Sequence, residues 1–341
     1  MAPGLIETRS IPADNPGKHI NVKPVDRNIF PDGFKTSGQH PPLRDQLYSY
    51  SSFPKYIEGT TVWQPTTYQH SPEKWVHQFT TAELNELSLT AVAFLSSSAP
   101  LTGITKSDFS LPTLAPILAS IKDTLLNGPG FVLFKGIPVE QWGNHKSAVA
   151  YLILSSHLGY PVSQNGRGHI LGHVKDLGED STQIDKVRIY RTNARQFFHA
   201  DDADLVGLLC IARAHSGGES DVASVHEVWN ILQAERPDIA ELLTQDIWYV
   251  DRKGEVSVGE EPYIRTAVFY LETPDPATPS RTQRVYCKWD PYYVRSLTRF
   301  SDKGIIPPLS AAQKDAIDVL EAICDRVKLH MILEVGDIQF V

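Results

Sequence analysis

The sequence predicts an α+β protein, mainly β with helices, in which flanking helices pack on a double-stranded β-helix (jelly-roll) core. Three observations support this class. Amphipathic helical patterns precede about residue 160, short strand-like segments separated by turn residues follow it, and there is neither an internal repeat nor a βαβ alternation. We therefore expect β-strands to build the core and helices to cover it.

The composition is that of a globular protein rather than a disordered or fibrous one, because 41% of the 341 residues are hydrophobic and 21% are charged. The formal net charge is −8, so no bulk positive charge recruits nucleic acid or an anionic membrane. The three cysteines lie far apart, and no window is apolar enough to span a bilayer. We expect a cytoplasmic protein without nucleic-acid or membrane partners.

Residues 1–70 predict an extended N-terminal arm, because they are rich in Pro, Gly, Ser and Tyr and show no sustained period. Residues 71–341 predict a single jelly-roll domain. Its first part, 80–158, is helical, and its β core begins at about residue 128 and continues over 160–341. The sequence leaves the oligomeric state open, a homo-oligomer included.

Two helices are predicted in the first part of this domain. Thr80 and Glu83 can form a capping box at the start of the first helix. The apolar face of that helix comprises Leu84, Leu87, Ala91, Val92 and Leu95. The apolar face of the second comprises Leu114, Ile117, Leu118, Ile121 and Leu125. The second helix ends at Asn127-Gly128, a short buried strand follows over 130–136, and residues 148–158 return to a helical pattern.

The second part of the domain reads as short strands interrupted by two helices. The strand-like segments are 160–175, 187–199, 205–213, 246–251, 263–271, 284–289 and 332–341. One helix begins at Ser224 and is closed by Pro237. The other begins at Ser310 and carries Ile317, Leu320, Ile323 and Val327 on one side. We expect the strand over 332–341 to leave an unpaired apolar edge.

A possible metal-binding pattern lies at the end of one strand-like run. His199 and Asp201 are two positions apart, so in a strand they project from the same face with Cα atoms about 7 Å apart. An imidazole and a carboxylate could then converge on one cation, as in the 2-His-1-carboxylate triad of non-haem iron(II). This HxD pattern is short, and a surface turn that caps the next strand is the alternative.

The order of the neighbouring motifs makes the pattern more specific. After the HxD motif come the apolar run LVGLLCIARA, the turn GGES (217–220) and the helix start AS (223–224). GFVLFKGIPVE and LGYPVSQNGRGHILGHV precede it, and LEVGDIQF follows. Over roughly residues 128–341 this arrangement resembles the TauD/TfdA (taurine dioxygenase-like) family of iron(II)- and 2-oxoglutarate-dependent oxygenases, particularly its fungal-type members.

The resemblance implies roles for three residues. His199 and Asp201 would be iron(II) ligands. Ser220 takes the place of the Ser or Thr that, in the family, hydrogen-bonds the distal carboxylate of 2-oxoglutarate. A hydroxyl can donate to a carboxylate, and adjacent glycines let the backbone approach closely. The alternative for Ser220 is a plain turn residue.

Four further residues are candidates for substrate contacts. Arg191 and Asn193 share the parity of the HxD histidine in a predicted strand, so they would face the same cavity. Gln164 and Asn165 lie in a loop that often approaches the substrate pocket in the family, and their alternative role is to stabilise that loop. An inward Arg191 would suit a carboxylate or sulfonate, so the expected partner is a small anionic molecule.

The family pattern is incomplete at the end of the sequence. Family members continue beyond the turn at Gly336-Asp337 to a third ligand, a histidine, and to an arginine that binds 2-oxoglutarate. Three histidines follow the HxD motif, His215, His226 and His330, and none of them aligns with the missing ligand. The chain as given is therefore expected to be a poor or inactive catalyst, with activity restored by downstream residues.

The expected activity is oxidation of an unactivated C–H bond, with iron(II), 2-oxoglutarate and O₂ as cofactors and with release of succinate and CO₂. Hydroxylation is the default outcome, and desaturation or cyclisation are variants. Two alternatives remain open. One is a non-catalytic or degenerate jelly-roll binding protein, which the incomplete site favours. The other is a cupin-like metal enzyme, although such proteins commonly gather several histidines from one segment.

Overall fold

A computed structural model describes residues 47–97, 99–162, 164, 169–201, 203–253, 256, 259–272 and 283–341. Its α-helices are α1 (Thr81–Ser96), α2 (Leu114–Asn127), α3 (Val139–Leu158), α4 (Val225–Glu235), α5 (Pro237–Leu243), α6 (Pro291–Arg295), α7 (Thr298–Ser301) and α8 (Ala311–Val327). Its strands are β1 (Val76–Gln78), β2 (Val132–Lys135), β3 (Gly207–Leu209), β4 (Ser220–Val222), β5 (Trp248–Asp251), β6 (Tyr263–Thr266), β7 (Phe269–Leu271), β8 (Val285–Cys287), β9 (Leu329–Met331) and β10 (Ile338–Phe340). The predicted α+β class is confirmed.

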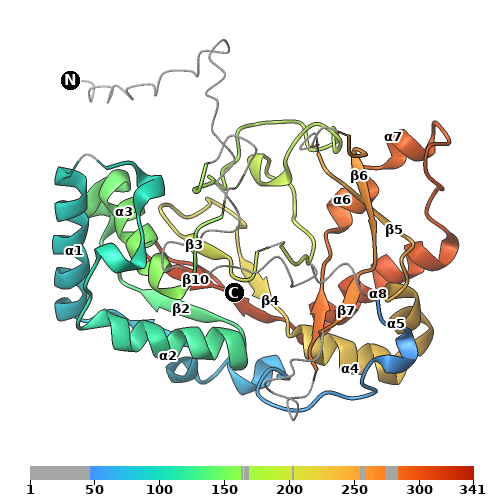
Figure 1. Cartoon of the computed structure of the whole chain (residues 1–341), viewed down its shortest axis with the longest axis horizontal. Coiled ribbons are helices and arrows are strands. Elements are labelled where there is room, and N and C mark those ends of the chain that lie inside the picture. Colours follow the sequence, from blue (N-terminus) through green and yellow to red (C-terminus); the bar gives the residue numbers. More distant parts are fainter. Residues whose placement is uncertain are drawn as a thin grey trace. The chain divides into compact units, whose positions relative to one another are not determined.

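The largest sheet contains four strands in the order β1-β2-β10-β3 (Figure 1). β1 runs parallel to β2, whereas β10 is antiparallel to both β2 and β3, with Ile338 opposite Phe134 on one side and Leu209 on the other. Three two-stranded ribbons, β4–β9, β5–β6 and β7–β8, complete the described strands. The expected unpaired edge in the last strand is wrong, because β10 is paired on both sides and fully buried.

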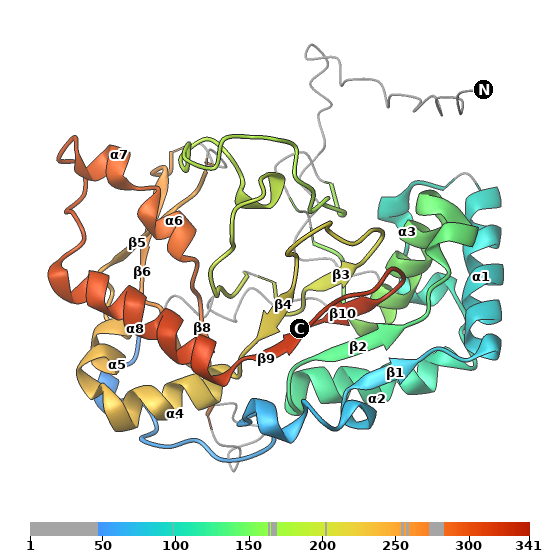
Figure 2. The same ribbon diagram turned by 180° about the vertical axis from the view of Figure 1, so that it is seen from behind.

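Helices α1, α2 and α3 gather beside this sheet and share one hydrophobic core with it (Figure 2). The capping box at Thr80 and Glu83 is present, and Leu114, Leu118, Ile121 and Leu125 are buried in α2 as predicted. The predicted face of α1 was partly wrong. Its buried side centres on Leu87, Ala91 and Phe94, whereas Val92 is 47% exposed.

A second hydrophobic core lies among α4, α5, α8 and the shorter ribbons. Its largest fully buried side chains are Trp229, Trp248 and Phe269. The predicted apolar residues of α8 are buried behind a capping box at Ser310 and Gln313. Ser224 caps α4 by accepting from the Glu227 N–H, but Pro237 begins α5 directly after α4 ends. The residue that stops one helix therefore starts the next.

The described part of the predicted N-terminal arm, residues 47–70, packs on this second core. Phe53 and Ile57 are buried members of it. The indole N–H of Trp229 donates to the Pro54 carbonyl (2.9 Å), and Asn230 pairs with both backbone groups of Ile57 (2.8 Å each). Residues 1–46 lie outside the described part of the chain.

The strands predicted over 160–175 and 187–199 are wrong. In its described residues this stretch contains only a 3-10 helix, Ile189–Arg191, and an isolated bridge between Ala200 and Trp289. Its backbone is held by single hydrogen bonds, such as those from the N–H groups of Lys175 and Leu177 to the carbonyls of Tyr190 and Arg191. Alternating apolar residues here do not pair as strands because most of the segment is exposed rather than half-buried on a sheet.

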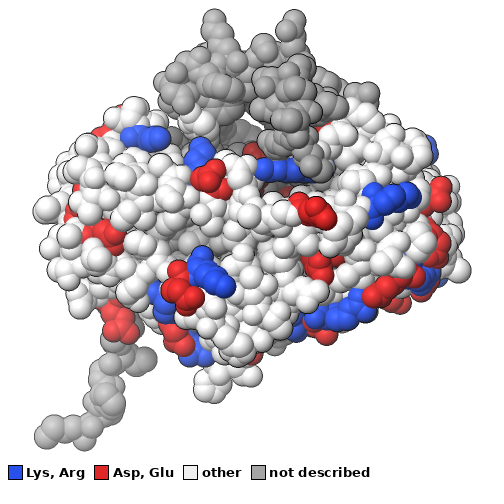
Figure 3. Space-filling view, turned by 90° about the horizontal axis from the view of Figure 1, so that it is seen from below, with Lys and Arg blue, Asp and Glu red and all other residues white. Residues whose placement is uncertain are grey.

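Charged side chains of both signs are interspersed on the face seen in Figure 3. Ion pairs also join helices of the described chain, including Arg326 with Glu235 (2.8 Å) and Arg236 with Asp315 (2.8 Å). Exposed pairs of this kind contribute little to stability. Within the part of the chain that the structure describes, no helix is long and apolar enough to cross a membrane.

Candidate iron site

The structure brings the side chains of His199 and Asp201 together. The imidazole Nε2 lies 3.8 Å from one Asp201 carboxylate oxygen. Two adjacent ligand atoms of an octahedral iron(II) stand about 3.0 Å apart when each is about 2.1 Å from the metal. The observed separation is longer, so the two side chains would have to move closer together to share a metal ion. Both residues lie at the surface, so a ligand can reach them and their side chains have room to adjust.

The tautomer of His199 is set by its own backbone. Nδ1 lies 2.8 Å from the carbonyl oxygen of Phe197, which can only accept, so Nδ1 carries the proton. Nε2 is then an acceptor, and the Gln196 side-chain amide lies 3.2 Å from it. Metal-ligating histidines commonly have this arrangement, in which the second nitrogen donates to a carbonyl. A metal would replace the amide of Gln196 as the partner of Nε2.

The HxD pair is anchored to the second core through its backbone. The Ala200 N–H donates to the Trp289 carbonyl (2.8 Å) in the isolated bridge. Trp289 is buried, and its ring meets that of Trp248 edge-on with centroids 5.5 Å apart. On the other side of the histidine, the Phe198 N–H donates to Glu321 of α8 (3.1 Å). The backbone around His199 is therefore held by Trp289 and by α8 although it belongs to no named strand.

A second carboxylate, Asp290, lies close enough to interact electrostatically with both His199 and Asp201. Burial raises its pKa above the ordinary aspartate value, the interaction with His199 opposes this rise, and the negative charge of Asp201 adds to it. One Asp290 oxygen also accepts the Tyr292 N–H (2.8 Å) and caps α6. The sequence does carry a local signal for this residue, because Asp followed by Pro291 is typical of a helix start, but Asp290 was not among the predicted site residues.

Ser220 lies in β4, opposite Met331 of β9, rather than in a plain turn. Its hydroxyl donates to the Gln339 side-chain carbonyl (2.8 Å), and Gln339 is buried in β10. Gly217 and Gly218 precede it with φ of 77° and 75°, which only glycine adopts at low cost. The turn therefore places Ser220 at the start of β4, where its backbone pairs with β9 and its side chain contacts β10.

The candidate substrate residues do not converge. Arg191 is exposed and forms an ion pair with Glu179 (2.5 Å). Asn193 is exposed, and the parity argument that joined it to the HxD histidine fails because the strand is absent. Gln164 is exposed, and its side-chain amide donates weakly to the Val162 carbonyl of its own loop (3.3 Å). Asn165 lies outside the described residues.

Two of the later histidines, His226 and His330, have other partners, and His215 is exposed. His226 is buried, with Nδ1 2.6 Å from the Thr61 hydroxyl and Nε2 accepting the Val285 N–H. His330 pairs with Asp221 (2.7 Å) across the β4–β9 ribbon. Among the described residues, no group of three or more His, Cys, Asp or Glu side chains could hold a metal ion. We therefore assign no third protein ligand.

The sequence matches the model of the taurine catabolism dioxygenase TauD, TfdA family over residues 97–341. The chain belongs to this family. It is therefore an oxidoreductase of the iron- and 2-oxoglutarate-dependent dioxygenase class, with Fe(II), 2-oxoglutarate and O₂ as cofactors. This TauD/TfdA protein carries its HxD motif and the Ser220 turn inside the matched range.

Two curated relatives cover most of the chain. FR-33289 synthase of Streptomyces rubellomurinus is 27% identical over 84% of this chain and 81% of its own length. Taurine hydroxylase-like protein SAT17 of Stachybotrys chartarum is 22% identical over 79% of this chain and 68% of its own length. Both alignments cover more than three quarters of this chain, so the similarity extends well beyond the HxD motif.

Solved structures confirm the fold. An asparagine oxygenase in complex with Fe(II), 2S,3S-3-hydroxyasparagine and succinate aligns with a TM-score of 0.57 at 15% identity, over 78% of this chain and 84% of that one. The non-haem iron oxygenase OrfP with Fe and alpha-ketoglutaric acid aligns with a TM-score of 0.52 at 14% identity, over the same shares. The TauD/TfdA protein thus has the jelly-roll core with packed helices that its sequence predicts.

Proposed function

We propose that this protein oxidises an unactivated C–H bond of a small anionic metabolite, by hydroxylation or by desaturation or cyclisation, and releases succinate and CO₂. The observation that carries the proposal is the proximity of His199 Nε2 to an Asp201 carboxylate oxygen (3.8 Å), together with the Nδ1–H to carbonyl contact that leaves Nε2 of the neutral ring available. We assign these two side chains as iron(II) ligands. Membership of the TauD/TfdA family supports the reaction type.

The chain's own residues bind and orient. His199 offers an unprotonated Nε2 because Phe197 holds the proton on Nδ1, and Asp201 offers a negative oxygen. Ser220 can turn its hydroxyl from Gln339 to the distal carboxylate of 2-oxoglutarate, and the flanking glycines leave room for that approach. Bound iron(II) and 2-oxoglutarate would activate O₂, which is the oxidant for C–H cleavage.

The substrate is proposed to be anionic and to resemble an acid of low molecular weight. A curated relative is named as a taurine hydroxylase-like protein, and taurine carries a sulfonate. Arg191 can serve such a group only by exchanging its present partner, Glu179. Asn193, Gln164 and Asn165 remain proposed neighbours of the substrate.

Anaerobic titration tests the metal assignment directly. Iron(II) followed by 2-oxoglutarate should give the weak visible charge-transfer band of the chelate, at one iron per chain. His199→Ala should lose the band. His330→Ala is a matched control, because it removes another imidazole that faces an aspartate (2.7 Å) but should keep the band. A band that survives in His199→Ala and disappears in His330→Ala would transfer the assignment to β9.

A non-catalytic, degenerate jelly-roll protein is the second candidate, and one observation favours it. Within the described ranges the HxD pair has no third protein ligand. The same titration separates the two proposals, since a degenerate protein gives no band at saturating iron(II) and 2-oxoglutarate while circular dichroism reports an intact fold. The cupin-like alternative is not supported, because the chain belongs to the TauD/TfdA family.

A further inference from the structure

Lys253 occupies an unusual position beside the segment that leads to the HxD motif. It directly follows β5 and Arg252, and it is the non-glycine residue with positive φ (51°) among those the structure describes. A left-handed backbone is unfavourable for a lysine by about 1 kcal/mol or more. Contacts with the surrounding residues must therefore hold it in this conformation.

Asp251 holds the backbone of Lys253 in this conformation. The buried Asp251 carboxylate accepts the Lys253 N–H (2.8 Å) across two positions, which is the geometry of an Asx turn. Arg299 of α7 binds the same carboxylate with both guanidinium nitrogens (2.6 and 2.8 Å), and Ser296 donates to it (2.6 Å). Asp251 is therefore saturated by other donors, and the Lys253 ammonium is not needed as its counter-ion.

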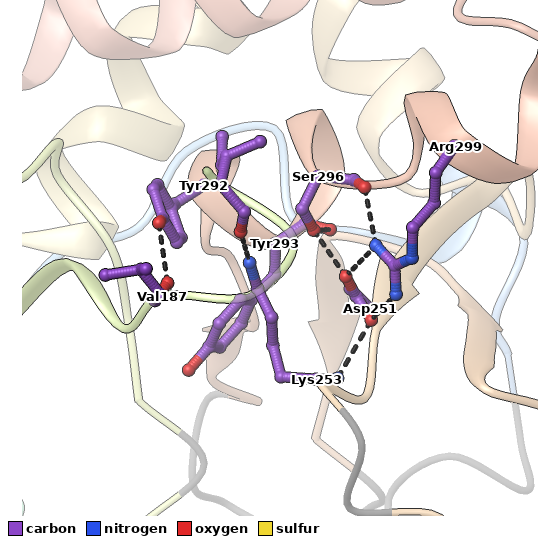
Figure 4. Close-up of polar contacts among 8 residues, drawn as sticks. Val187, Asp251, Lys253, Tyr292, Tyr293, Ser296 and Arg299 are labelled. Atoms are coloured by element: carbon purple, nitrogen blue, oxygen red, sulfur yellow. Dashed lines mark hydrogen bonds and ion pairs between the residues drawn. The ribbon is translucent and has the colours of Figure 1, made fainter. Parts of the chain in front are cut away.

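The ammonium instead reaches toward two tyrosines and a backbone carbonyl (Figure 4). Its Nζ lies 4.3 Å from the ring centroid of Tyr292 and 5.5 Å from that of Tyr293, and it donates to the Ile184 carbonyl. Among the described residues no carboxylate lies within ion-pair distance of it. The Lys253 ammonium is therefore held by two aromatic faces and one backbone carbonyl.

The hydroxyl groups of the same two tyrosines hold the next residues of the segment. Tyr292 donates to the Val187 carbonyl (2.7 Å), and Arg188 donates to the Tyr293 hydroxyl (2.5 Å). Lys253 therefore acts twice on residues 184–188, once directly at Ile184 and once through the rings. These five contacts form a cluster, which we call the tyrosine clamp: Lys253, Tyr292, Tyr293 and residues 184–188.

The clamp is connected to the HxD pair at both ends of the segment. Trp289, three positions before Tyr292, binds the Ala200 N–H that lies between the two ligands (2.8 Å). Thus one short stretch of chain, 289–293, holds the segment at 187–188 and again at 200. Its support comes from β5, since Trp248 packs on Trp289 and Asp251 sets the lysine turn.

We propose that Lys253 is a positioning residue, whose contacts with Ile184, Tyr292 and Tyr293 fix the segment that carries His199 and Asp201. Only the expected effect of Lys253 on iron binding and catalysis rests on the proposed function. The tyrosine clamp itself is present in the metal-free chain. Burial lowers the pKa of Lys253 to about 8, with Arg188 and Arg299 adding to the effect and Asp251 and Asp290 opposing it. The lowered pKa agrees with the half-buried position of the ammonium beside the two tyrosine rings.

Hydrogen exchange of the metal-free protein provides the first test. The reporter is the Ala200 amide, which donates to Trp289. In Lys253→Met this amide and those of residues 185–192 should exchange about tenfold faster, the change expected for losing one hydrogen bond and its cation–π contact. Lys253→Arg, which keeps a cation and donors, should restore most of the protection. Unchanged exchange at Ala200 in a folded Lys253→Met protein overturns the proposal.

Lys146 provides a matched control for this substitution. Its ammonium also lies over an aromatic ring, Trp142 (4.5 Å), and donates to a neutral oxygen, the Ser88 hydroxyl (2.7 Å), but in the helical layer. Lys146→Met should leave Ala200 exchange unchanged. Equal acceleration in both variants would show general loosening and would also overturn the proposal.

Lys253→Gly separates the side chain from the strained backbone. Glycine accepts φ of 51°, so this variant relieves the backbone while removing the ammonium. It should be no less stable than Lys253→Met, yet Ala200 should exchange as fast. The iron(II) dissociation constant, followed by the charge-transfer band, should rise about tenfold in both variants. If the parent protein gives no band, the proposed function fails while the exchange result still decides the clamp.

Discussion

Two regions of the molecule are stabilised by different kinds of contact. One is the helical layer over the four-stranded sheet, and the other is the segment 184–201. In the layer, apolar side chains such as Leu118 and Ile153 repeat with the helical period. They are buried together with sheet residues such as Phe134. In the segment, the order comes from individual contacts to backbone carbonyls and amides, made by side chains such as Tyr292. Many small interactions fix the layer, whereas a few directed ones fix the segment that carries the HxD pair.

The difference indicates where stability and chemistry reside. The layer can lose one apolar contact only at a large cost in folding free energy, because the cavity left behind is not refilled. The segment is exposed over much of its length, so its residues can change with little effect on the global free energy of unfolding. Substitutions in the two regions should therefore separate activity from stability.

The largest expected effect on activity follows from changing the HxD pair. His199→Ala and Asp201→Ala should each abolish iron-dependent 2-oxoglutarate turnover, because each removes one of two assigned ligands. The His199 side chain is partly exposed and that of Asp201 is exposed, so the free energy of unfolding should change by less than about 1 kcal/mol. Succinate formation and urea denaturation measure the two quantities. Turnover at the parental rate in either variant would remove the iron assignment.

The largest expected effect on stability lies in the hydrophobic core that the helical layer shares with the sheet. Phe134 is fully buried, stacks on Phe79 at 5.3 Å and meets Phe340 edge-on at 5.9 Å. Phe134→Ala should lower the free energy of unfolding by about 3–5 kcal/mol. Urea denaturation measures this loss. The iron titration of the folded variant should remain parental, and a lost band in a folded protein would show that the layer and the site are coupled.

Ser220→Ala should have an intermediate effect, confined to the co-substrate. Losing one charge-assisted hydrogen bond costs ~1.5–3 kcal/mol, roughly a ten- to hundredfold weaker affinity for 2-oxoglutarate. The primary substrate should be affected less. The variant also leaves the buried Gln339 carbonyl without its donor, so a modest loss of stability should accompany it. An unchanged apparent constant for 2-oxoglutarate would leave Ser220 as a partner of Gln339 alone.

The smallest expected effect is a dependence of stability on pH. The folded pKa of Lys253 is about 8, below its ordinary value of 10.5. Between these values the unfolded chain binds more protons, so this group makes the folded state more stable as the pH rises from 8 to 10.5. The gain should be about 1 kcal/mol after allowance for solvent screening. Lys253→Met should lack it in urea denaturation series, and a parallel pH profile in both proteins would contradict the assignment.

Much of the layer could be predicted from the sequence because its signals are local. The capping boxes at Thr80 and Ser310, each formed within four consecutive residues, mark the starts of α1 and α8. The burial of Leu114, Leu118 and Ile121 follows from the helical period alone. The place of β10 in the middle of the sheet was not predictable, since its neighbours β2 and β3 come from distant parts of the chain.

The site was predictable only as far as its spacing. The two-position spacing of His199 and Asp201 predicted that their side chains lie close together, and they do, although the strand on which that prediction relied is absent. The conformation of the segment before them was not predictable, because Val187 and Arg188 bind tyrosines that are 105 residues later in the sequence. Lys253 carries no sequence signal at all, since its role depends on a left-handed backbone that lysine rarely adopts.

The bridge between Ala200 and Trp289 holds the HxD pair separately from the loop that precedes it. Between the clamp at Arg188 and the bond from Phe198 to Glu321, residues 189–197 are held by contacts of their own, such as Arg191 with Glu179 and Arg195 with Glu321. These ion pairs lie at the surface and are separate from the bridge at Ala200. Side-chain changes in this loop should therefore leave the backbone between His199 and Asp201 in place.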